Sequence, residues 1–462
     1  MESLTMSKRN FTLLIIILLI IVVAVFWFLY FKGYITNIPK YDNPGTNFIS
    51  QFNPFGESKP NPPPVPPPFD ISEDEPSVTT ETLEAKLVRV SSMPIAGFTV
   101  FNKERLKDVP IVAPETGPLI ENTLEPEKET KNKKASVKPA PPETEFAPAL
   151  RYVDRATGNI FQTFVDKIEE RKFSVTIIPR VYEAYFGNKG ESVIMRYLKA
   201  DEETIETFVG NLPKELLGGD TTGNNEAKGS FLPNNVRDIS MSPDGLKIFY
   251  LFESNSDSGS NMIGITMNLL NNKKIQVFDS PFTEWLSFWP NNNLITLTTK
   301  PSANIPGYMY TINSLGKNFS KILGDINGLT TLGSPDGKLI LYGNNNLSLY
   351  IYDINSRSFN LLGVRTLPEK CVWGKANDVI YCAVPKFVSP GEYPDSWYQG
   401  EVSFSDQLWK IDVKTGNATI ILDPFAIVFE EIDGIKMALS EAEDYLFFVN
   451  KKDSFLWKLE LK

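Results

Sequence analysis

The chain contains 462 residues, carries a formal net charge of -10 and has no histidine. The lack of histidine excludes Ser-His-Asp and Cys-His nucleophile systems and every histidine-ligated metal site. The acidic balance disfavours nucleic acid as a partner, because no basic excess is available to displace counterions from phosphates. We predict no cofactor and no metal.

An uncharged apolar run, FTLLIIILLIIVVAVFWFLYF, extends from Phe11 to Phe31. At about 1.5 Å per residue it is long enough to cross a bilayer core of roughly 30 Å. Lys8 and Arg9 precede the run and favour a cytoplasmic N-terminus over residues 1–10. No small-residue cleavage site follows, so residues 11–32 are predicted to be an uncleaved signal anchor rather than a secretory peptide. We therefore expect a single-pass protein of the cell membrane, with the remaining chain outside the cytoplasm.

Residues 33–85 contain few periodic apolar residues and include the proline cluster KPNPPPVPPPFD. Such a cluster favours extended polyproline II structure over packed structure. We expect a disordered stalk that spaces the following domain from the bilayer. The alternative is a ligand for a proline-recognising module.

The motif Ser-Pro-Asp-Gly occurs twice, at residues 242–245 and 334–337, and each copy joins an extended apolar segment to an aromatic-rich one. Proline pre-sets the first turn dihedral and glycine accepts a positive φ, so the motif suits a tight hairpin. Weaker versions of the same unit give a period of roughly 40 to 55 residues, which is typical of propellers and solenoids.

Each repeat can be divided into four short strands, A to D. Strand B recurs as a β-branched and aromatic segment, which indicates burial. Strand C repeats the register apolar, aromatic, any, apolar and then Asp, Asn or Glu, at residues 309–313, 349–353, 408–412 and 456–460. Residues 86–462 are therefore predicted to be all-β, forming an about seven-bladed β-propeller of four-stranded antiparallel blades. One transmembrane helix and a Pro-rich linker precede it.

These SPDG turns followed by an apolar strand resemble the TolB-type, or WD40-like (PD40), β-propeller repeats, and the resemblance covers residues 86–462. The order of anchor, proline stalk and propeller also looks like that of uncharacterised membrane-anchored bacterial envelope proteins. The resemblance implies a propeller fold and no particular activity.

The last repeat ends after its C strand, so we expect residues 86–91 (KLVRVS) to supply its outer strand and close the ring. An uncovered edge would invite aggregation. A segment rich in Pro, Glu, Lys and Thr interrupts the first A-to-B connection at about residues 102–148. Its composition predicts a disordered insertion, either a tether or a segment that folds on a partner.

The two cysteines, Cys371 and Cys382, flank residues 375–378 at equal distances. If that stretch is a four-residue hairpin turn, the cysteines are directly opposed. A cross-strand disulfide is then expected in an oxidising compartment, provided that they form a non-hydrogen-bonded pair. Two buried free thiols are the alternative.

The A-to-B and C-to-D loops of such blades emerge on one face of the ring, and the B-to-C and D-to-A loops emerge on the other. The second face carries the loop 385–406, which concentrates aromatic residues among Pro and Gly. Exposed aromatic side chains suit protein or carbohydrate contacts, whereas a loop folded onto its own blade would bury them. The predicted binding residues on this face are Lys300, Tyr308, Phe387, Tyr393, Trp397 and Tyr398.

No nucleophile elbow, Walker motif or dinucleotide glycine fingerprint occurs in the sequence. We predict a protein- or glycan-recognition or scaffold module of the cell envelope, because function on such scaffolds lies in the loops. One alternative is a carbohydrate-active enzyme with paired carboxylates in the central channel. The other is a purely structural envelope component.

Overall fold

The computed structural model of the protein describes residues 86–107, 143–215, 225–256 and 259–462. The predicted signal anchor and proline stalk lie outside these residues. Within the described ranges, no helix combines the length and the apolar character needed to cross a bilayer.

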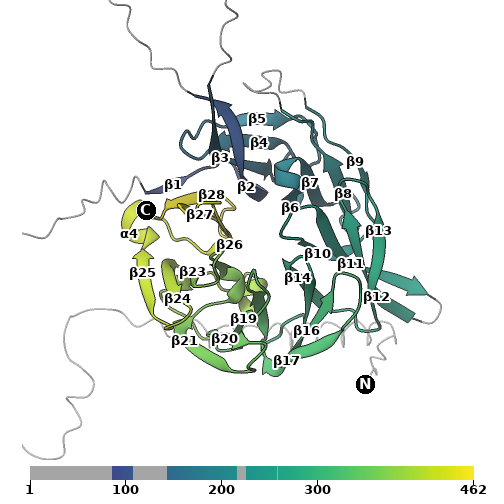
Figure 1. The fold of residues 1–462 in the computed structure, drawn as a ribbon, viewed down its shortest axis with the longest axis vertical. Helices are drawn as coiled ribbons and strands as arrows, with labels where there is room; N and C mark the ends of the chain where they lie inside the picture. Colours follow the sequence, from purple (N-terminus) through teal and green to yellow (C-terminus); the bar gives the residue numbers. More distant parts are fainter. Residues whose placement is uncertain (1–85, 108–142, 216–224, 257–258) are drawn as a thin grey trace, which may run out of the picture. The chain divides into compact units, whose positions relative to one another are not determined.

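The described residues form seven four-stranded antiparallel sheets, arranged as blades around a central channel (Figure 1). This confirms the predicted all-β, seven-bladed propeller. From the inner to the outer strand, blade 1 consists of β2 (Ile95–Leu106), β3 (Thr144–Asp154), β4 (Ile160–Phe164) and β5 (Arg171–Ser174), and blade 2 of β6 (Val181–Gly187), β7 (Ser192–Leu198), β8 (Ile205–Asn211) and β9 (Lys228–Phe231). Blade 3 consists of β10 (Val236–Met241), β11 (Lys247–Ser256), β12 (Gly259–Asn268) and β13 (Lys274–Ser280). Blade 4 consists of β14 (Trp285–Asn291), β15 (Leu294–Thr299), β16 (Pro306–Asn313) and β17 (Ser320–Asn327).

Blades 5 and 6 continue this order, and the described parts of the connections contain four short helical segments. Blade 5 consists of β18 (Thr330–Gly333), β19 (Leu339–Gly343), β20 (Ser348–Asp353) and β21 (Phe359–Arg365), and blade 6 of β22 (Cys371–Trp373), β23 (Val379–Pro385), β24 (Asp406–Asp412) and β25 (Ala418–Leu422). The helical segments are η2 (Asn188–Gly190), η3 (Pro368–Lys370), α3 (Asp395–Tyr398) and α4 (Pro424–Val428).

Blade 7 combines the two ends of the propeller sequence. Its strands β26 (Gly434–Leu439), β27 (Tyr445–Asn450) and β28 (Leu456–Glu460) are followed by β1 (Leu87–Arg89), which pairs antiparallel with β28. The amide of Glu460 also donates to the carbonyl of Lys86 (2.9 Å). The closing strand therefore lies within residues 86–91.

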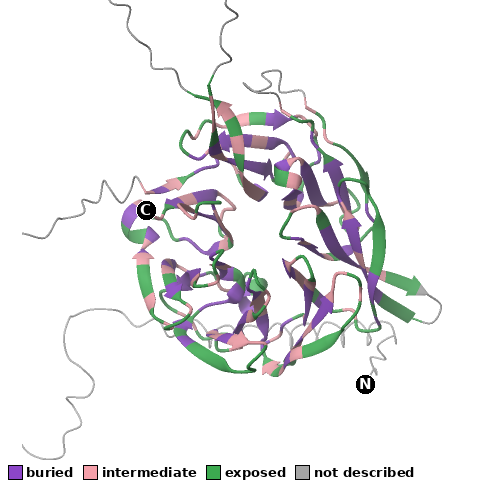
Figure 2. Ribbon diagram, in the orientation of Figure 1, coloured by how far each residue is buried: buried purple, intermediate pink, exposed green. Residues whose placement is uncertain are grey.

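The packing follows the alternation of strand side chains toward the two neighbouring blades. Strands in the middle of each blade are almost fully buried, as in β7, where Ile194 and Met195 have no exposed surface. Exposed residues gather on the outer strands such as β21 (Figure 2). The core therefore lies between blades, and the central channel is bordered by the innermost strand of each blade.

The SPDG turns act as hairpin connectors. The Ser242 hydroxyl donates to Asp244 Oδ1 (2.6 Å) and accepts from the Lys247 amide (2.9 Å). Gly245 has φ 67°, a left-handed conformation that glycine adopts without a steric penalty. The second turn repeats these bonds with Ser334, Asp336 and Leu339, and its Gly337 has φ 72°.

The prediction that residues at about 102–148 are disordered is wrong at the two ends of this insertion. β2 and β3 remain paired as far as Leu106 and Thr144, beyond the end of β4. Ion pairs hold this ribbon, because Arg105 contacts both Glu145 (2.7 Å) and Asp166 (2.6 Å). The central part of the insertion, residues 108–142, lies outside the described residues.

Candidate functional site

A large hollow lies at one end of the central channel. It has a volume of about 420 Å³ and is bordered by A-to-B turns or inner strands from blades 1, 2, 3, 6 and 7. We call this hollow the mouth, and the face of the ring that contains it the turn face. Its lining residues include Phe101, Asn102, Lys189, Asp244, Lys375 and Glu441.

Most polar side chains in the mouth already have partners. The Asn102 side-chain amide donates to Glu441 Oε2 (2.5 Å), and Lys375 Nζ donates to the backbone carbonyl of Glu441 (2.5 Å). Asp244 is held within its own SPDG turn. Lys189 differs, because its exposed amine has no ion-pair partner among the residues that the structure describes. It is therefore available to a ligand.

Lys189 lies in an unusual turn. Asn188, Lys189 and Gly190 are consecutive left-handed residues, with φ of 48°, 51° and 83°. This conformation costs roughly 1 to 2 kcal/mol for each non-glycine residue, so the surroundings must hold it. Blade 1 holds it through Arg151, whose guanidinium donates to the Gly190 carbonyl (2.6 Å), and blade 3 holds it through the Gly245 carbonyl, which accepts from the Asn188 amide (2.7 Å).

Two carboxylates on the inner strands of blades 2 and 3 have internal partners. Glu183 accepts from the Tyr185 hydroxyl (2.7 Å) and pairs with Arg196. Asp238 accepts from the backbone amide and the hydroxyl of Ser287 (2.5 and 2.6 Å). Burial raises the pKa of Asp238, and the negative charge of Glu183 adds to the rise. The contacts of Asp238 connect the inner strands β10 and β14.

The loop between β23 and β24 crosses the opposite end of the channel. We call residues 386–405 of this loop the cap. Asp395 in the cap accepts from the Ala303 amide of blade 4 (2.5 Å), and the Trp397 carbonyl accepts from Lys451 Nζ of blade 7 (2.5 Å). The cap therefore bridges several blades, which differs from both predictions for this loop: an exposed contact surface, or packing on its own blade alone.

Two of the six predicted binding residues cannot act as exposed contacts. Tyr393 and Trp397 are each only 3% exposed, because they pack with Leu347, Leu367 and Phe404 in one apolar cluster. The prediction that they form an open binding surface is wrong, since their aromatic area already stabilises the cap.

The other four predicted residues remain accessible on separate elements. Phe387 is 73% exposed, and Tyr398 is partly exposed beside the channel. Lys300 is exposed and pairs with Glu284 (3.3 Å), while the half-buried Tyr308 donates its hydroxyl hydrogen to Asp325 (2.7 Å). Without Tyr393 and Trp397, these residues no longer form the aromatic surface that the sequence predicted.

An ion triad that the sequence analysis missed anchors the cap. The fully buried Lys370 donates to Asp406 Oδ2 (2.7 Å) and contacts Asp433, and both carboxylates are fully buried. Trp397 Nε1 also donates to Asp433 (2.9 Å). Burial raises the pKa of Asp406 to about 6; it also opposes ionisation of Asp433, but Lys370 holds that pKa below its ordinary value. No spacing rule marks Lys370, Asp406 and Asp433 in the sequence.

Glu369 and Tyr398 meet where the cap faces the channel. The Tyr398 hydroxyl donates to the Glu369 carboxylate, and both residues border a cavity of about 60 Å³ beside β14 and β18. Burial raises the pKa of Glu369 to about 7, although the Tyr398 bond and the charge of Lys370 oppose the rise. Glu369 nevertheless remains exposed where it borders this cavity.

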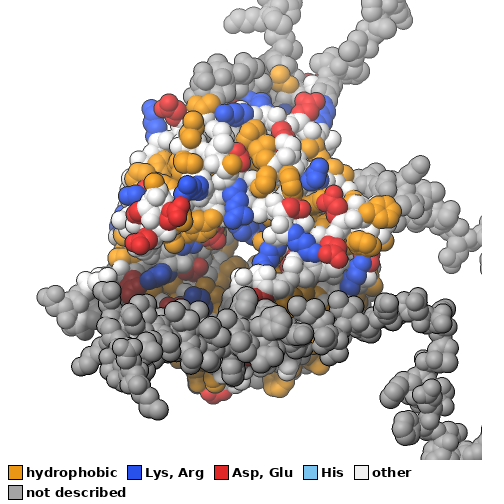
Figure 3. All heavy atoms as spheres, turned by 180° about the vertical axis from the view of Figure 1, so that it is seen from behind, with side chains coloured by type: hydrophobic (Ala, Val, Ile, Leu, Met, Phe, Trp, Pro, Cys, Tyr) orange, Lys and Arg blue, Asp and Glu red, His pale blue; other side chains and the backbone are white. Residues whose placement is uncertain are grey.

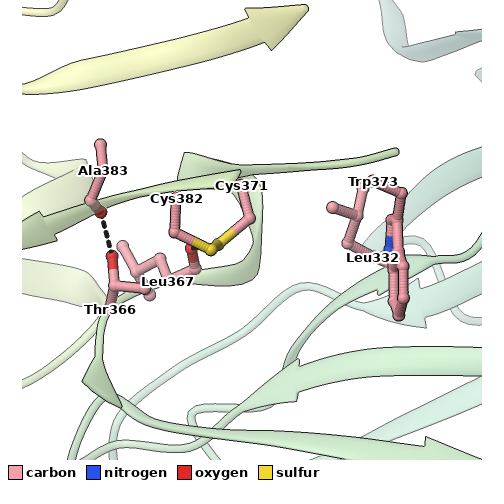
Figure 4. Close-up of a disulfide and its surroundings, with 7 residues drawn as sticks. All are labelled: Leu332, Thr366, Leu367, Cys371, Trp373, Cys382 and Ala383. Carbon is pink, nitrogen blue, oxygen red and sulfur yellow. Dashed lines mark hydrogen bonds between the residues drawn. A yellow bond between two sulfur atoms is a disulfide. The ribbon is translucent and has the colours of Figure 1, made fainter. Parts of the chain in front are cut away.

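Cys371 and Cys382 are joined by a disulfide between β22 and β23 (Figure 4). They lie directly opposite each other with their Cα atoms 4.1 Å apart, the spacing of a non-hydrogen-bonded pair. The neighbouring Thr366 hydroxyl donates to the Ala383 carbonyl (2.6 Å). Both cysteines are buried.

The face turned away from the viewer in Figure 1 carries Lys, Arg, Asp and Glu side chains among hydrophobic ones (Figure 3). No charge of one sign dominates the part of this face that is visible. A surface of mixed charge does not indicate nucleic-acid binding.

No protein-family model matches the sequence, and no curated protein is similar to it. Similar solved structures include an oligogalacturonate lyase from Vibrio parahaemolyticus (TM-score 0.46, 7% identity, 68% of this chain and 86% of that chain) and an oligogalacturonate lyase in complex with manganese (0.46, 8%, 68% and 85%). TolB from Acinetobacter baumannii is also similar (0.35, 13%, 67% and 61%). These likenesses concern the fold alone.

Proposed function

We propose that the protein is a membrane-anchored, extracytoplasmic propeller that acts as a recognition or scaffold module, and that its ligand binds at the mouth. One observation carries the assignment to this face: a hollow of about 420 Å³ into which the strained turn at Lys189 brings an amine that has no ion-pair partner within the described ranges. Strained backbone that its surroundings enforce is concentrated at binding sites. The partners we propose are other envelope proteins or a surface glycan.

The opposite face is less suited to the same role. The aromatic side chains that would supply contact area there, Tyr393 and Trp397, are buried in the cap. Rigid loops on a scaffold bind through the side chains that they leave exposed. This moves the proposed binding surface from the cap to the turn face.

Crosslinking in intact cells tests the proposed face. A photoreactive amino acid at Asn102 would report from the mouth, and the same residue at Phe387 would report from the exposed part of the cap. We expect an adduct at position 102, and we expect Lys189→Glu to abolish it, because a ligand that contacts the amine then meets a negative charge. The matched control, Lys300→Glu, reverses a charge on the other face and should leave the adduct intact.

The outcomes separate the alternatives. An adduct at position 387 that responds to Lys300→Glu, with none at 102, would overturn the turn-face assignment. Adducts at neither position would support a purely structural envelope component.

The membrane anchor is proposed from the apolar run at residues 11–31. We expect the full-length chain to stay in the membrane pellet after alkaline extraction, and a chain without residues 1–32 to be released. Release of both chains would refute the anchor without bearing on the mouth.

A carbohydrate-active enzyme is the second candidate. The raised pKa of Asp238 beside Glu183 favours it, because a glycosidase needs one carboxyl that stays protonated near a second carboxylate. The test is hydrolysis of cell-wall polysaccharides by the wild type, Asp238→Asn and Glu183→Gln. Hydrolysis lost in both variants would establish this candidate, and no hydrolysis by the wild type would eliminate it.

A further inference from the structure

Another hollow lies on the turn face, between blades 3 and 4. It has a volume of about 220 Å³ and shares no lining residue with the mouth. We call it the side hollow, and its lining includes Lys247, Asn268, Lys273, Ile275, Trp289 and Leu315. An apolar cavity of roughly 150 Å³ accepts a benzene ring, so the side hollow has room for a small organic group.

Part of the lining of the side hollow is apolar. Leu315, from the turn after β16, is 67% exposed, and Ile275 of β13 is 41% exposed. The buried side chains of Met267 and Trp289 also contribute to the lining. Apolar side chains that remain exposed around a hollow offer contact area to an apolar part of a ligand.

The polar part of the lining presents hydrogen-bond donors. Asn268 Oδ1 accepts from the backbone amides of Leu270 and Asn271 (2.9 and 3.2 Å), and Asn271 Oδ1 accepts from the Lys273 amide (3.0 Å). Each asparagine therefore has its NH2 group left as a donor. Trp289 is only 2% exposed, and its Nε1 hydrogen has no acceptor among the described residues. Donors without acceptors favour a ligand that is rich in oxygen atoms.

Two lysines add positive charge to these donors. Lys247 and Lys273 are both exposed, and neither has an ion-pair partner in the part of the chain that the structure describes. The described residues that line the side hollow include no Asp or Glu. Asp244, in the adjoining SPDG turn, is held by the Ser242 hydroxyl and the Leu246 amide. The side hollow is therefore suited to a negatively charged ligand.

A comparison between blades shows that the turn at Asn268 does not itself require a neutral residue. The third strand ends at Asn268 in blade 3 and at Asn313 in blade 4, but at Asp353 in blade 5 and Asp412 in blade 6. Asp353 Oδ1 accepts from the amides two and three residues further on (2.8 and 2.9 Å), as Asn268 Oδ1 does. Aspartate therefore supports the same turn, and asparagine keeps a negative charge out of the side hollow.

We propose that the side hollow binds a small organic anion, in which a carboxylate or phosphoryl group is joined to an apolar part. The anionic oxygens accept hydrogen bonds from Lys247, Lys273 and Asn268, because charged donors and acceptors form the stronger bonds. The apolar part lies against Leu315 and Ile275. The side hollow is separate from the amine of Lys189, so the proposal does not depend on the ligand proposed for the mouth.

Fluorine NMR of the full-length chain, labelled with 5-fluorotryptophan, tests the site. Benzoate, phenyl phosphate and the uncharged benzyl alcohol are titrated separately at constant ionic strength, and the resonance that is missing from Trp289→Phe identifies the reporter. We expect at least one of the two anions to shift this resonance saturably and to bind about tenfold more tightly than benzyl alcohol. The anion that binds more tightly identifies the preferred group. No saturable shift with either anion, or equal binding of all three compounds, would overturn the proposal.

Two variants change the charge of the side hollow. Asn268→Asp adds a negative charge while keeping an oxygen for the amides of the turn, and Lys273→Gln removes a positive charge. We expect each variant to weaken binding of the preferred anion by about tenfold. Lys274→Gln is the matched control, because Lys274 is the next residue, is also exposed and does not line the side hollow. An unchanged affinity in Asn268→Asp or Lys273→Gln, or an equal loss in Lys274→Gln, would reject the site.

Discussion

Leu87 lies directly opposite Leu459 across the pairing of β1 with β28, and both side chains are buried in the core between blades 6 and 7. We expect Leu87→Ala to lower the free energy of unfolding by about 2 to 4 kcal/mol, because it leaves a cavity at the closure of the ring. Urea unfolding followed by tryptophan fluorescence would measure the change.

Val88 is the matched control for this closure. It is the next residue of β1 and is only half-buried, so Val88→Ala should cost about 1 kcal/mol or less. Equal losses for the two variants would show that strand pairing, rather than the side chain of Leu87, holds β1.

The Cys371–Cys382 disulfide should stabilise the β22–β23 hairpin of blade 6. Replacing both cysteines with Ala is expected to lower the free energy of unfolding by about 2 to 4 kcal/mol, chiefly because the unfolded chain gains freedom. Chemical denaturation of the wild type with and without reductant supplies the comparison. An unchanged unfolding curve after thiol analysis proves full reduction would contradict this expectation.

Lys370 neutralises two buried carboxylates, so its removal should be costly. Lys370→Met leaves Asp406 and Asp433 without their cation, and we expect a loss of about 3 to 5 kcal/mol. Lys386 offers a matched control, because its ion pair with Asp423 (2.7 Å) is partly exposed and should be worth about 1 kcal/mol or less. Comparable thermal shifts for Lys370→Met and Lys386→Met would disprove the special role of the triad.

Glu369 should make stability depend on pH. Its pKa in the folded protein is raised to about 7 from an ordinary value of 4.5, so folding favours the protonated carboxyl. The stabilisation of the folded state by the protonated carboxyl is complete below about pH 4.5 and is lost as the pH rises toward 7. We expect Glu369→Gln, which stays neutral, to match the wild type at low pH and to exceed its stability above pH 7.

A change at Tyr398 tests the same titration of Glu369. Its hydroxyl bond favours ionised Glu369, so Tyr398→Phe should move the midpoint of the stability change to higher pH. A midpoint that stays in place would show that the bond does not act on the carboxyl.

Much of the fold could be predicted from local chemistry. The SPDG turns require a glycine with positive φ, and the alternation of the strands requires a buried sheet, so the blades follow from the sequence. The opposed positions of Cys371 and Cys382 follow in the same way, because register in a hairpin is set by its turn.

The site could be predicted only in part. The aromatic residues of the cap have the composition of a contact surface, and the sequence does not show that Trp397 finds a buried acceptor in Asp433. Lys189 and Lys273 lie in irregular connections. The sequence there has no periodic pattern from which their neighbours on distant strands could be predicted. These features depend on tertiary contacts between blades, which local patterns do not encode.

The composite blade also sets the order in which the molecule is completed. Blades 1 to 6 are each made from one continuous stretch of chain, apart from their insertions, and can assemble as they leave the ribosome. β1 is synthesised before all of them, yet it must wait for β28. A nascent chain that stalls before Leu456 therefore presents an open ring with unpaired edges, a form that proteases and chaperones can distinguish from the finished protein.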